Sequence, residues 1–212
     1  MTLRQLMFLV GLQLLAASNG TVVNFDTFTA GAVPPGWTVA ATTHGKPARW
    51  EVRQDQSAPT PPYVLAQVSN DPTDDRFPVA ILDGMNFRDG EISVRIKPLS
   101  GREDQGGGVV WRYRDENNYY LVRANASNNT VAVFRVKHGQ RVAIQPGVKH
   151  DIPANAWSIL KVVARGNRYQ IYVDHRRIME GVDSAFPGSG KVGLCTVADS
   201  VMYFDDFRVV PR

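Results

Sequence analysis

Residues 107–125 read GGVVWRYRDENNYYLVRAN, and this stretch decides the fold. Apolar and polar side chains alternate over residues 109–114, and four turn-forming residues, Asp-Glu-Asn-Asn, follow at 115–118. A second extended run then covers residues 119–125. Two such runs joined by turn residues predict an antiparallel β-hairpin.

The period-two pattern continues on both sides of this hairpin. In residues 91–97, Ile92, Val94 and Ile96 alternate with polar side chains, which predicts a half-buried strand. Further strands are expected at 130–137, 157–164, 169–173, 191–196 and 201–209. Loops are expected at 58–63 and 70–78. Short strands at roughly ten-residue spacing, with no helical pattern in the mature chain, predict one all-β domain over residues 19–212.

The composition narrows the class of protein. Lysine and arginine exceed aspartate and glutamate to give a net charge of +4, but they form no basic run, so we expect no nucleic-acid partner. Cys195 is the single cysteine, which excludes an internal disulfide. Its apolar neighbours predict a buried, unreactive thiol. Cysteine poverty fits a bacterial periplasmic or secreted protein.

The first 18 residues have the pattern of a signal peptide. Arg4 supplies the positive charge, residues 6–15 are largely apolar, and Ala16-Ala17-Ser18 offers small residues for cleavage after Ser18. The apolar run is too short to span a bilayer, and no other segment has a transmembrane pattern. A short buried core helix is the alternative. We therefore expect a secreted or periplasmic protein without membrane insertion after cleavage.

The central hairpin resembles that of the laminin G-like and DUF1080 group of concanavalin A-like proteins. Three later segments, at 152–157, 169–174 and 190–207, also look like this group, and residues 24–37 match its first strand and following loop. The resemblance implies an antiparallel jelly-roll β-sandwich. It does not settle function, because such sandwiches host lectins, adhesion modules, hydrolases and substrate-binding domains.

Some members of the group are described as 3-keto-disaccharide hydrolases or as relatives of family 16 glycoside hydrolases. The family 16 pattern of three carboxylates on one strand is absent here: Val-Arg-Gln follows Glu51, and Ile-Ser follows Glu91. Carboxylates from separate strands can still meet in space. An exported, lectin-like carbohydrate-binding module that uses the polar concave sheet face is therefore the leading hypothesis. A keto-disaccharide hydrolase and a protein-binding adhesion domain stay as alternatives.

A row of arginines is the predicted ligand site. We expect Val109, Trp111 and Tyr113, together with residues 120, 122 and 124 and residues 132, 134 and 136, to face the core. The opposite face then aligns the predicted carbohydrate-binding residues Arg112, Tyr119, Arg123, Arg135 and Arg95. Guanidinium groups and a phenol suit polyol hydroxyls, carboxylates or sulfates. A solvated face with internal ion pairs is the alternative, and a one-residue slip in register would exchange the faces.

Calcium is the predicted cofactor. Relatives with this fold hold a structural Ca²⁺ near the paired first and last strands, which points to Asp26 and Asp206 here. The loop with Asp71, Asp74 and Asp75 is a second candidate. An aspartate that caps a turn is the alternative for each.

Aromatic residues give a weaker signal. Trp111 and Trp157 alternate with apolar residues and are expected in the core, whereas Trp50, between two charged residues, is a candidate to line a site. His138 and His175 lie in turn-like contexts and are expected to be exposed.

Overall fold

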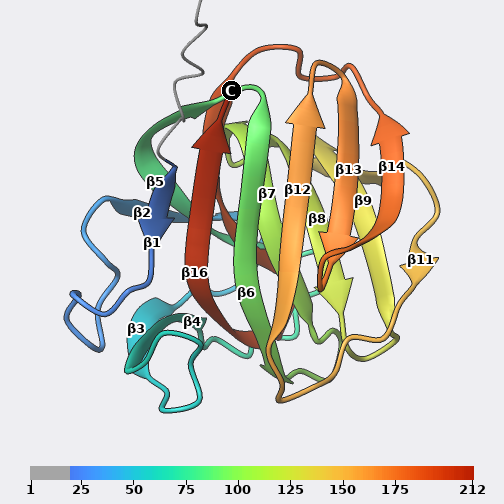
Figure 1. Cartoon of the computed structure of the whole chain (residues 1–212). Coiled ribbons are helices and arrows are strands. Elements are labelled where there is room, and N and C mark those ends of the chain that lie inside the picture. Colours follow the sequence, from blue (N-terminus) through green and yellow to red (C-terminus); the bar gives the residue numbers. More distant parts are fainter. Residues whose placement is uncertain (1–19) are drawn as a thin grey trace, which may run out of the picture.

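The computed structural model describes residues 20–212, which form two antiparallel β-sheets packed face to face (Figure 1). Sheet A consists, in spatial order, of β14 (Arg176–Val182), β13 (Arg168–Val173), β12 (Ser158–Arg165), β6 (Gly90–Ser100), β16 (Val201–Pro211), β4 (Tyr63–Gln67) and β3 (Trp50–Gln54), with β1 (Thr21–Val23) paired to β16. Sheet B consists of β10 (Gln140–Ala143), β9 (Thr130–Lys137), β8 (Asn118–Asn125), β7 (Gly106–Asp115), β15 (Gly190–Thr196), β5 (Phe77–Phe87) and β2 (Trp37–Thr42), with β11 (Val148–Lys149) paired to β9.

The predicted antiparallel sandwich is confirmed. Strands β6, β7, β8, β9, β12, β13, β15 and β16 begin and end within a few residues of the predicted bounds. No helix in residues 20–212 is long and apolar enough to cross a membrane. The predicted signal peptide, residues 1–18, lies outside the described residues.

The N-terminal part of the chain differs from the prediction. Four strands, β2 to β5, occupy a region in which no strand was predicted, and β5 begins inside the predicted loop 70–78. The segment compared with a first strand, residues 24–26, follows β1 and is not extended. Phe25 has a φ of 67°, which breaks the strand and turns its ring into the core against Trp37.

The main core fills the space between the two sheets. Ile92, Val94 and Ile96 of β6 point into it, as predicted, and meet Val109 and Trp111 from β7. The polar side chains of β6 therefore lie on the outer face of sheet A. In Figure 1, the broad strands of sheet A lie in front of β7, β8 and β9.

Sheet B buries both of its faces. The hydroxyl of Thr42 on β2 lies 2.7 Å from that of Tyr119 on β8, although these strands are four positions apart in the sheet. On a flat sheet that separation is about 19 Å. Arg141 of β10 likewise reaches to 4.3 Å from the ring centroid of Phe77 at the start of β5. The sheet therefore curls on itself, and a second apolar cluster that includes Leu121 fills its concave face.

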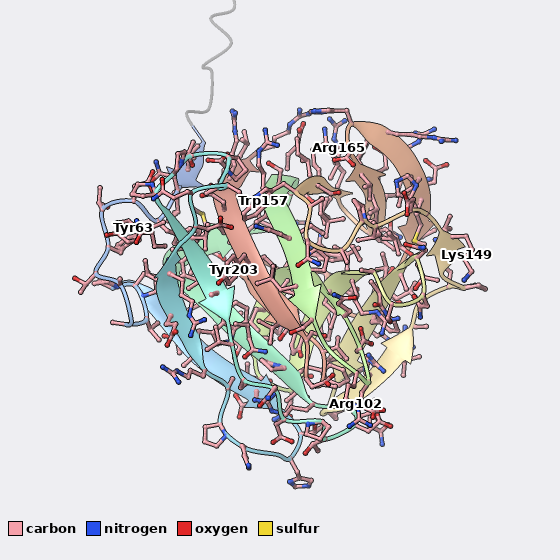
Figure 2. All side chains as sticks on the ribbon, turned by 90° about the horizontal axis from the view of Figure 1, so that it is seen from below. Tyr63, Arg102, Lys149, Trp157, Arg165 and Tyr203 are labelled. Carbon is pink, nitrogen blue, oxygen red and sulfur yellow. The ribbon has the colours of Figure 1, made fainter. Side chains whose placement is uncertain are left out.

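The aromatic predictions hold in part. Trp111 is buried as predicted, but Trp50 is also a core residue, packed against Phe204 with ring centroids 5.6 Å apart. Trp157, expected in the core, is half-buried at the side of sheet A. Figure 2 labels Trp157 and Tyr203. Lys97 Nζ lies 5.7 Å from the Trp157 ring centroid and 5.9 Å from that of Tyr203.

Cys195 is buried on the concave side of sheet B, as predicted. Desolvation by burial raises the pKa of its thiol to about 12. A thiol with this pKa holds almost no thiolate at neutral pH and is therefore unreactive.

Replacing Gly193 by alanine is expected to destabilise the fold by about 3 kcal/mol, the upper end of the usual cost of overpacking. Gly193 lies in β15, at the centre of sheet B, and a Cβ there would lie 2.2 Å from Ala80 O and 2.8 Å from Ile81 Cδ1. The Ala80 carbonyl belongs to the neighbouring strand β5 and cannot move without breaking the hydrogen bonds between β5 and β15. Denaturant unfolding measures the loss. Gly188→Ala is the matched control, because its Cβ would meet only Arg114 Nη2, at 3.6 Å; equal stability of the two variants would contradict the steric explanation.

Candidate functional site

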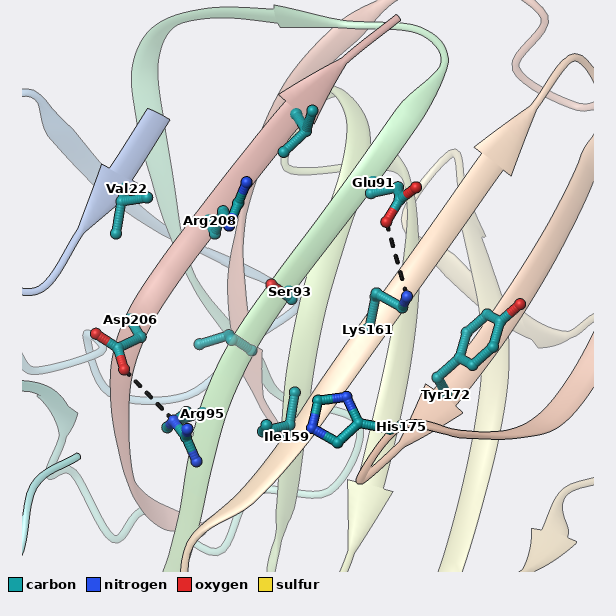
Figure 3. A pocket seen from close by; sticks show the side chains of 12 residues that line it. Val22, Glu91, Ser93, Arg95, Ile159, Lys161, Tyr172, His175, Asp206 and Arg208 are labelled. Carbon is teal, nitrogen blue, oxygen red and sulfur yellow. Dashed lines mark ion pairs between the residues drawn. The ribbon is translucent and has the colours of Figure 1, made fainter. Parts of the chain in front are cut away.

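A shallow groove crosses the outer face of sheet A and is here called the outer groove. Strand alternation places polar side chains of β6, β12, β13 and β16 on this face, opposite those that enter the core. The groove has a volume of about 610 Å³ (Figure 3). Its main polar side chains are Glu91, Ser93, Arg95, Lys161, Tyr172, His175, Asp206 and Arg208.

The charged side chains along the groove form ion pairs with one another but stay partly exposed to solvent. Lys161 Nζ lies 3.7 Å from Glu91 Oε2, and the C-terminal Arg212 donates to the other oxygen of Glu91 at 2.8 Å. Across the groove, Arg95 Nε lies 3.4 Å from Asp206 Oδ2. The side chains of the Glu91–Lys161 and Arg95–Asp206 pairs are between 28 and 39% exposed. Such pairs contribute little to stability and can exchange partners with a ligand.

Tyr172 supplies an aromatic surface beside these charges. The ammonium group of Lys161 lies 4.5 Å from the centroid of the Tyr172 ring, and the phenol donates a hydrogen bond to Gln170 Oε1 at 3.1 Å. His175 stands next to Tyr172 in the turn before β14 (Figure 3) and is exposed, as predicted. The groove therefore combines charged donors, carboxylate acceptors and one aromatic ring.

Arg112 and Tyr119, two residues of the predicted arginine row, are buried. Arg112 has a φ of 50° at a β-bulge in β7, which turns its side chain into the protein and moves Tyr113 to the concave face. Tyr119 lies beneath the curled sheet B, and desolvation raises the pKa of its phenol. The prediction that these two side chains line an open ligand face is therefore wrong.

The remaining predicted arginines lie on three different surfaces. Arg123 is on the concave face of sheet B, where it pairs with Asp104 at 2.8 Å and is 13% exposed. Arg135 is opposite Tyr120 in the β8–β9 register, so it faces the core side and pairs with Asp183 at 2.5 Å. The predicted alternation of β9 was displaced by one residue, so the side chains assigned to its two faces are exchanged in the structure. Only Arg95 lies in the outer groove.

The predicted calcium ligands, Asp26 and Asp206, contact the first residue of β4 and the loop before it, respectively. Asp26 Oδ1 accepts a hydrogen bond from Tyr63 N at 3.0 Å, and Asp206 Oδ1 accepts one from Thr60 Oγ1 at 2.8 Å. The other oxygen of Asp206 faces Arg95. Within residues 20–212, no group of three or more His, Cys, Asp or Glu side chains converges as a metal site would require. Calcium binding stays a prediction, and titration calorimetry with CaCl₂ tests it.

The second calcium candidate, the loop with Asp71, Asp74 and Asp75, is a turn in which the Asp71 carboxylate accepts hydrogen bonds from the loop itself. Asp71 accepts hydrogen bonds from the hydroxyl and the amide of Thr73 and from Lys46 N. The Thr73 hydroxyl is the largest cause that lowers the pKa of Asp71 to about 2. Asp74 and Asp75 lie in the same loop, and Asp75 pairs with Arg141 at 3.2 Å.

Sequence reasoning missed Lys161 and Tyr172 as site residues, and it considered Glu91 in the search for the family 16 carboxylate pattern but not as a ligand contact. The alternation within residues 159–163 and 170–172 does mark their outward-facing positions. The pattern of residues along the chain does not show the order of the strands in the sheet. That order places β6 between β12 and β16 and so brings four strands to one groove.

The two packed antiparallel sheets give the protein the concanavalin A-like fold, which is the fold of many lectins and glucanases. Its fold is similar to that of the carbohydrate-binding module CBM66 from Bacillus subtilis, with a TM-score of 0.65 and 22% identity over 85% of this chain and 97% of the module. It is also similar to a β-glucanase from Bacillus licheniformis, with a TM-score of 0.61 and 12% identity over 91% of this chain and 98% of that enzyme.

The sequence comparison gives one partial relative. A levanase of Bacillus subtilis (strain 168) is 31% identical over 133 residues, which cover 62% of this chain and 19% of the levanase. The match thus spans about a fifth of that enzyme's length. No family model matches the chain.

Proposed function

We propose that the protein is a noncatalytic carbohydrate-binding module and that the outer groove is its binding site. The observation that supports this most is the groove itself, an open polar depression beside an aromatic ring. The concave face of sheet B, where the sequence placed the ligand, is filled by the protein's own side chains. The similarity to CBM66 and the partial match to a levanase support a carbohydrate ligand.

The chemistry of the groove suits neighbouring hydroxyls on a sugar ring. Lys161 and Arg95 donate hydrogen bonds to oxygen, whereas Glu91 and Asp206 accept them from hydroxyl protons. Charge-assisted hydrogen bonds of this kind are stronger than neutral ones. The face of Tyr172 offers an apolar surface for the C–H side of a sugar.

The arrangement of carboxylates favours binding over hydrolysis. In the register of β6 and β16, Val210 pairs with Glu91 and Asp205 with Arg95, so Asp206 lies more than three residues along the strands from Glu91. That offset is about 11 Å. Inverting glycosidases hold their carboxyl groups roughly 6.5–9.5 Å apart and retaining ones about 5 Å. A relation to the 3-keto-disaccharide hydrolases of the DUF1080 group stays a prediction.

The adhesion alternative requires a contiguous apolar patch. In residues 20–212, the large exposed apolar side chains are Val22, Val39, Val142 and Val182, and each belongs to a different strand. Their scatter over β1, β2, β10 and β14 supports a polar ligand instead. Export by the predicted signal peptide is part of the proposal, because it would bring the module to extracellular glycans.

Tyr172→Ala is expected to weaken glycan binding about tenfold, which corresponds to about 1.4 kcal/mol. The substitution removes the aromatic surface and the contact with Lys161. A glycan array identifies the ligand, with and without EDTA to include calcium, and calorimetry compares the variants. Lys137→Ala, an exposed change at the end of β9, is the control and should bind as wild type does. If no glycan binds, or if Tyr172→Ala binds normally, the outer groove is not the site.

A further inference from the structure

A second depression continues the outer groove toward the edge of sheet A. It has a volume of about 530 Å³ and is lined on the outer face by Val163, Arg165, Arg168, Gln170, Glu180 and Val182. The two depressions meet where Glu91 of the first and Val163 of the second are direct partners in the β6–β12 register. The phenol of Tyr172, which lines the first depression, donates a hydrogen bond to Gln170, which lines the second.

The combined surface is long compared with one sugar ring. It runs across β16, β6, β12, β13 and β14, which is four inter-strand spacings. Four spacings amount to about 19 Å. A ligand that contacts both depressions is therefore a chain.

This surface carries more cationic than anionic side chains. Each carboxylate already has a cationic partner: Glu91 pairs with Lys161 and Arg212, Asp206 pairs with Arg95, and Glu180 pairs with Arg177 at 3.2 Å. A separate set of guanidinium groups on the same surface forms no ion pair with any residue in the range 20–212: Arg165, Arg168 and Arg208. All three are exposed.

These guanidinium groups lie at opposite ends of the surface. Arg208 is on β16, whereas Arg165 and Arg168 flank the turn between β12 and β13. Across the sheet, Arg165 lies two inter-strand spacings from β16 and Arg168 lies three, which is about 10 Å and about 14 Å. Planar guanidinium groups bind carboxylates and sulfates in a bidentate manner.

We propose that the outer face of sheet A binds an acidic oligosaccharide chain, whose carboxylate or sulfate groups contact Arg208 at one end and Arg165 and Arg168 at the other. This inference rests on the proposed function and adds the charge and length of the ligand. Sugar hydroxyls bind between the charged ends, at Glu91, Lys161 and Tyr172. A nucleic acid fits less well, because a phosphate between the two charged ends would bring only acceptor oxygens to Glu91, whereas a sugar hydroxyl donates to that carboxylate.

The test is titration calorimetry of the full protein with uronate oligosaccharides of increasing length. Sulfated and neutral oligosaccharides of the same length, and a single-stranded oligonucleotide, are the comparison ligands. The variant Arg165→Ala/Arg168→Ala removes one charged end. The double variant Lys137→Ala/Lys149→Ala removes the same charge from sheet B and is the matched control.

We expect affinity for an acidic chain to rise with length and to fall at least tenfold in the Arg165/Arg168 variant. The control variant should bind acidic chains as wild type does, and the choice between uronate and sulfated chains identifies the anionic group. Equal affinity for a monosaccharide and a chain, or normal binding by the arginine variant, overturns the inference while carbohydrate binding stands. Equal or tighter binding of the oligonucleotide also overturns it. Absence of binding to any glycan instead rejects the proposed function.

Discussion

Replacing Arg112 by alanine is expected to lower the free energy of unfolding by about 3–5 kcal/mol, because the substitution removes a buried guanidinium that pairs with Asp89 and leaves the buried carbonyl of Phe186 without its donor. Only 2% of Arg112 is exposed. Its guanidinium donates to the carbonyl of Arg88 at 3.0 and 3.1 Å, to that of Phe186 at 2.8 Å and to that of Gly166 at 2.5 Å. Asp89 is its ionic partner, at 3.3 Å.

Denaturant unfolding at neutral pH measures this loss. Arg95→Ala is the control, since its ion pair is 39% exposed on the arginine side, and loss of such a pair costs less than about 1 kcal/mol. Arg112→Lys should be nearly as unstable as alanine, because one ammonium group cannot reproduce a guanidinium that spans three carbonyls. If Arg112→Ala costs no more than Arg95→Ala, the carbonyl contacts do not stabilise the fold.

Arg112 also shows where sequence reasoning about this chain stops. Alternation through residues 109–113 predicts Trp111 and Tyr113 on one face, but the bulge at Arg112 separates them. A positive φ at an arginine has no signal in the sequence, because the tertiary contacts of its side chain hold it there. Trp111, which lies before the bulge, was placed correctly.

The success of the period-two pattern depended on whether a strand has one exposed face. In β6, Ile92, Val94 and Ile96 are buried and the residues between them are polar, so the pattern fixes the register. In β9, Val133 points into the main core while Phe134 points into the concave cluster. Both faces are apolar, so the pattern does not distinguish them, and the predicted face of Arg135 was wrong.

The candidate site required long-range pairing that no local pattern encodes. Arg95 and Asp206 are more than a hundred residues apart in the chain and become neighbours because β16 returns beside β6. The early strands β2 to β5 were also missed. Among them, β5 pairs with β15 and β4 with β16, whereas, within residues 20–212, the edge strands β2 and β3 pair only with β5 and β4.

Between pH 4 and pH 7, the wild-type protein is expected to lose about 3 kcal/mol of stability relative to the variant Asp205→Asn. Asp205 is fully buried beside the groove residue Asp206, and desolvation by burial is the main cause that raises its pKa from 3.8 to about 6. Hydrogen bonds from Thr60 N, at 3.0 Å, and from Asp206 N, at 2.8 Å, oppose that shift. A shift of about two pKa units corresponds to about 3 kcal/mol.

The direction of this change in stability follows from the number of protons that the folded and unfolded states bind. The folded state keeps a proton on Asp205 that the unfolded state has released once the pH exceeds 3.8, so unfolding releases a proton in this window. The stabilising contribution is complete below about pH 4 and is lost as the pH rises through about 6. Other carboxylates, such as Asp183, have a lowered pKa and change stability in the opposite direction. The difference between wild type and Asp205→Asn removes their common contribution.

Denaturant unfolding of both proteins at half-unit intervals of pH gives this difference. Carboxyl ¹³C NMR reads the Asp205 titration directly in the folded protein. A carboxyl resonance of Asp205 that titrates below pH 4, or a pH-independent difference between the two proteins, would mean that its hydrogen bonds outweigh desolvation. Asp205 would then be a charged anchor for the loop at Thr60 at every pH above 4.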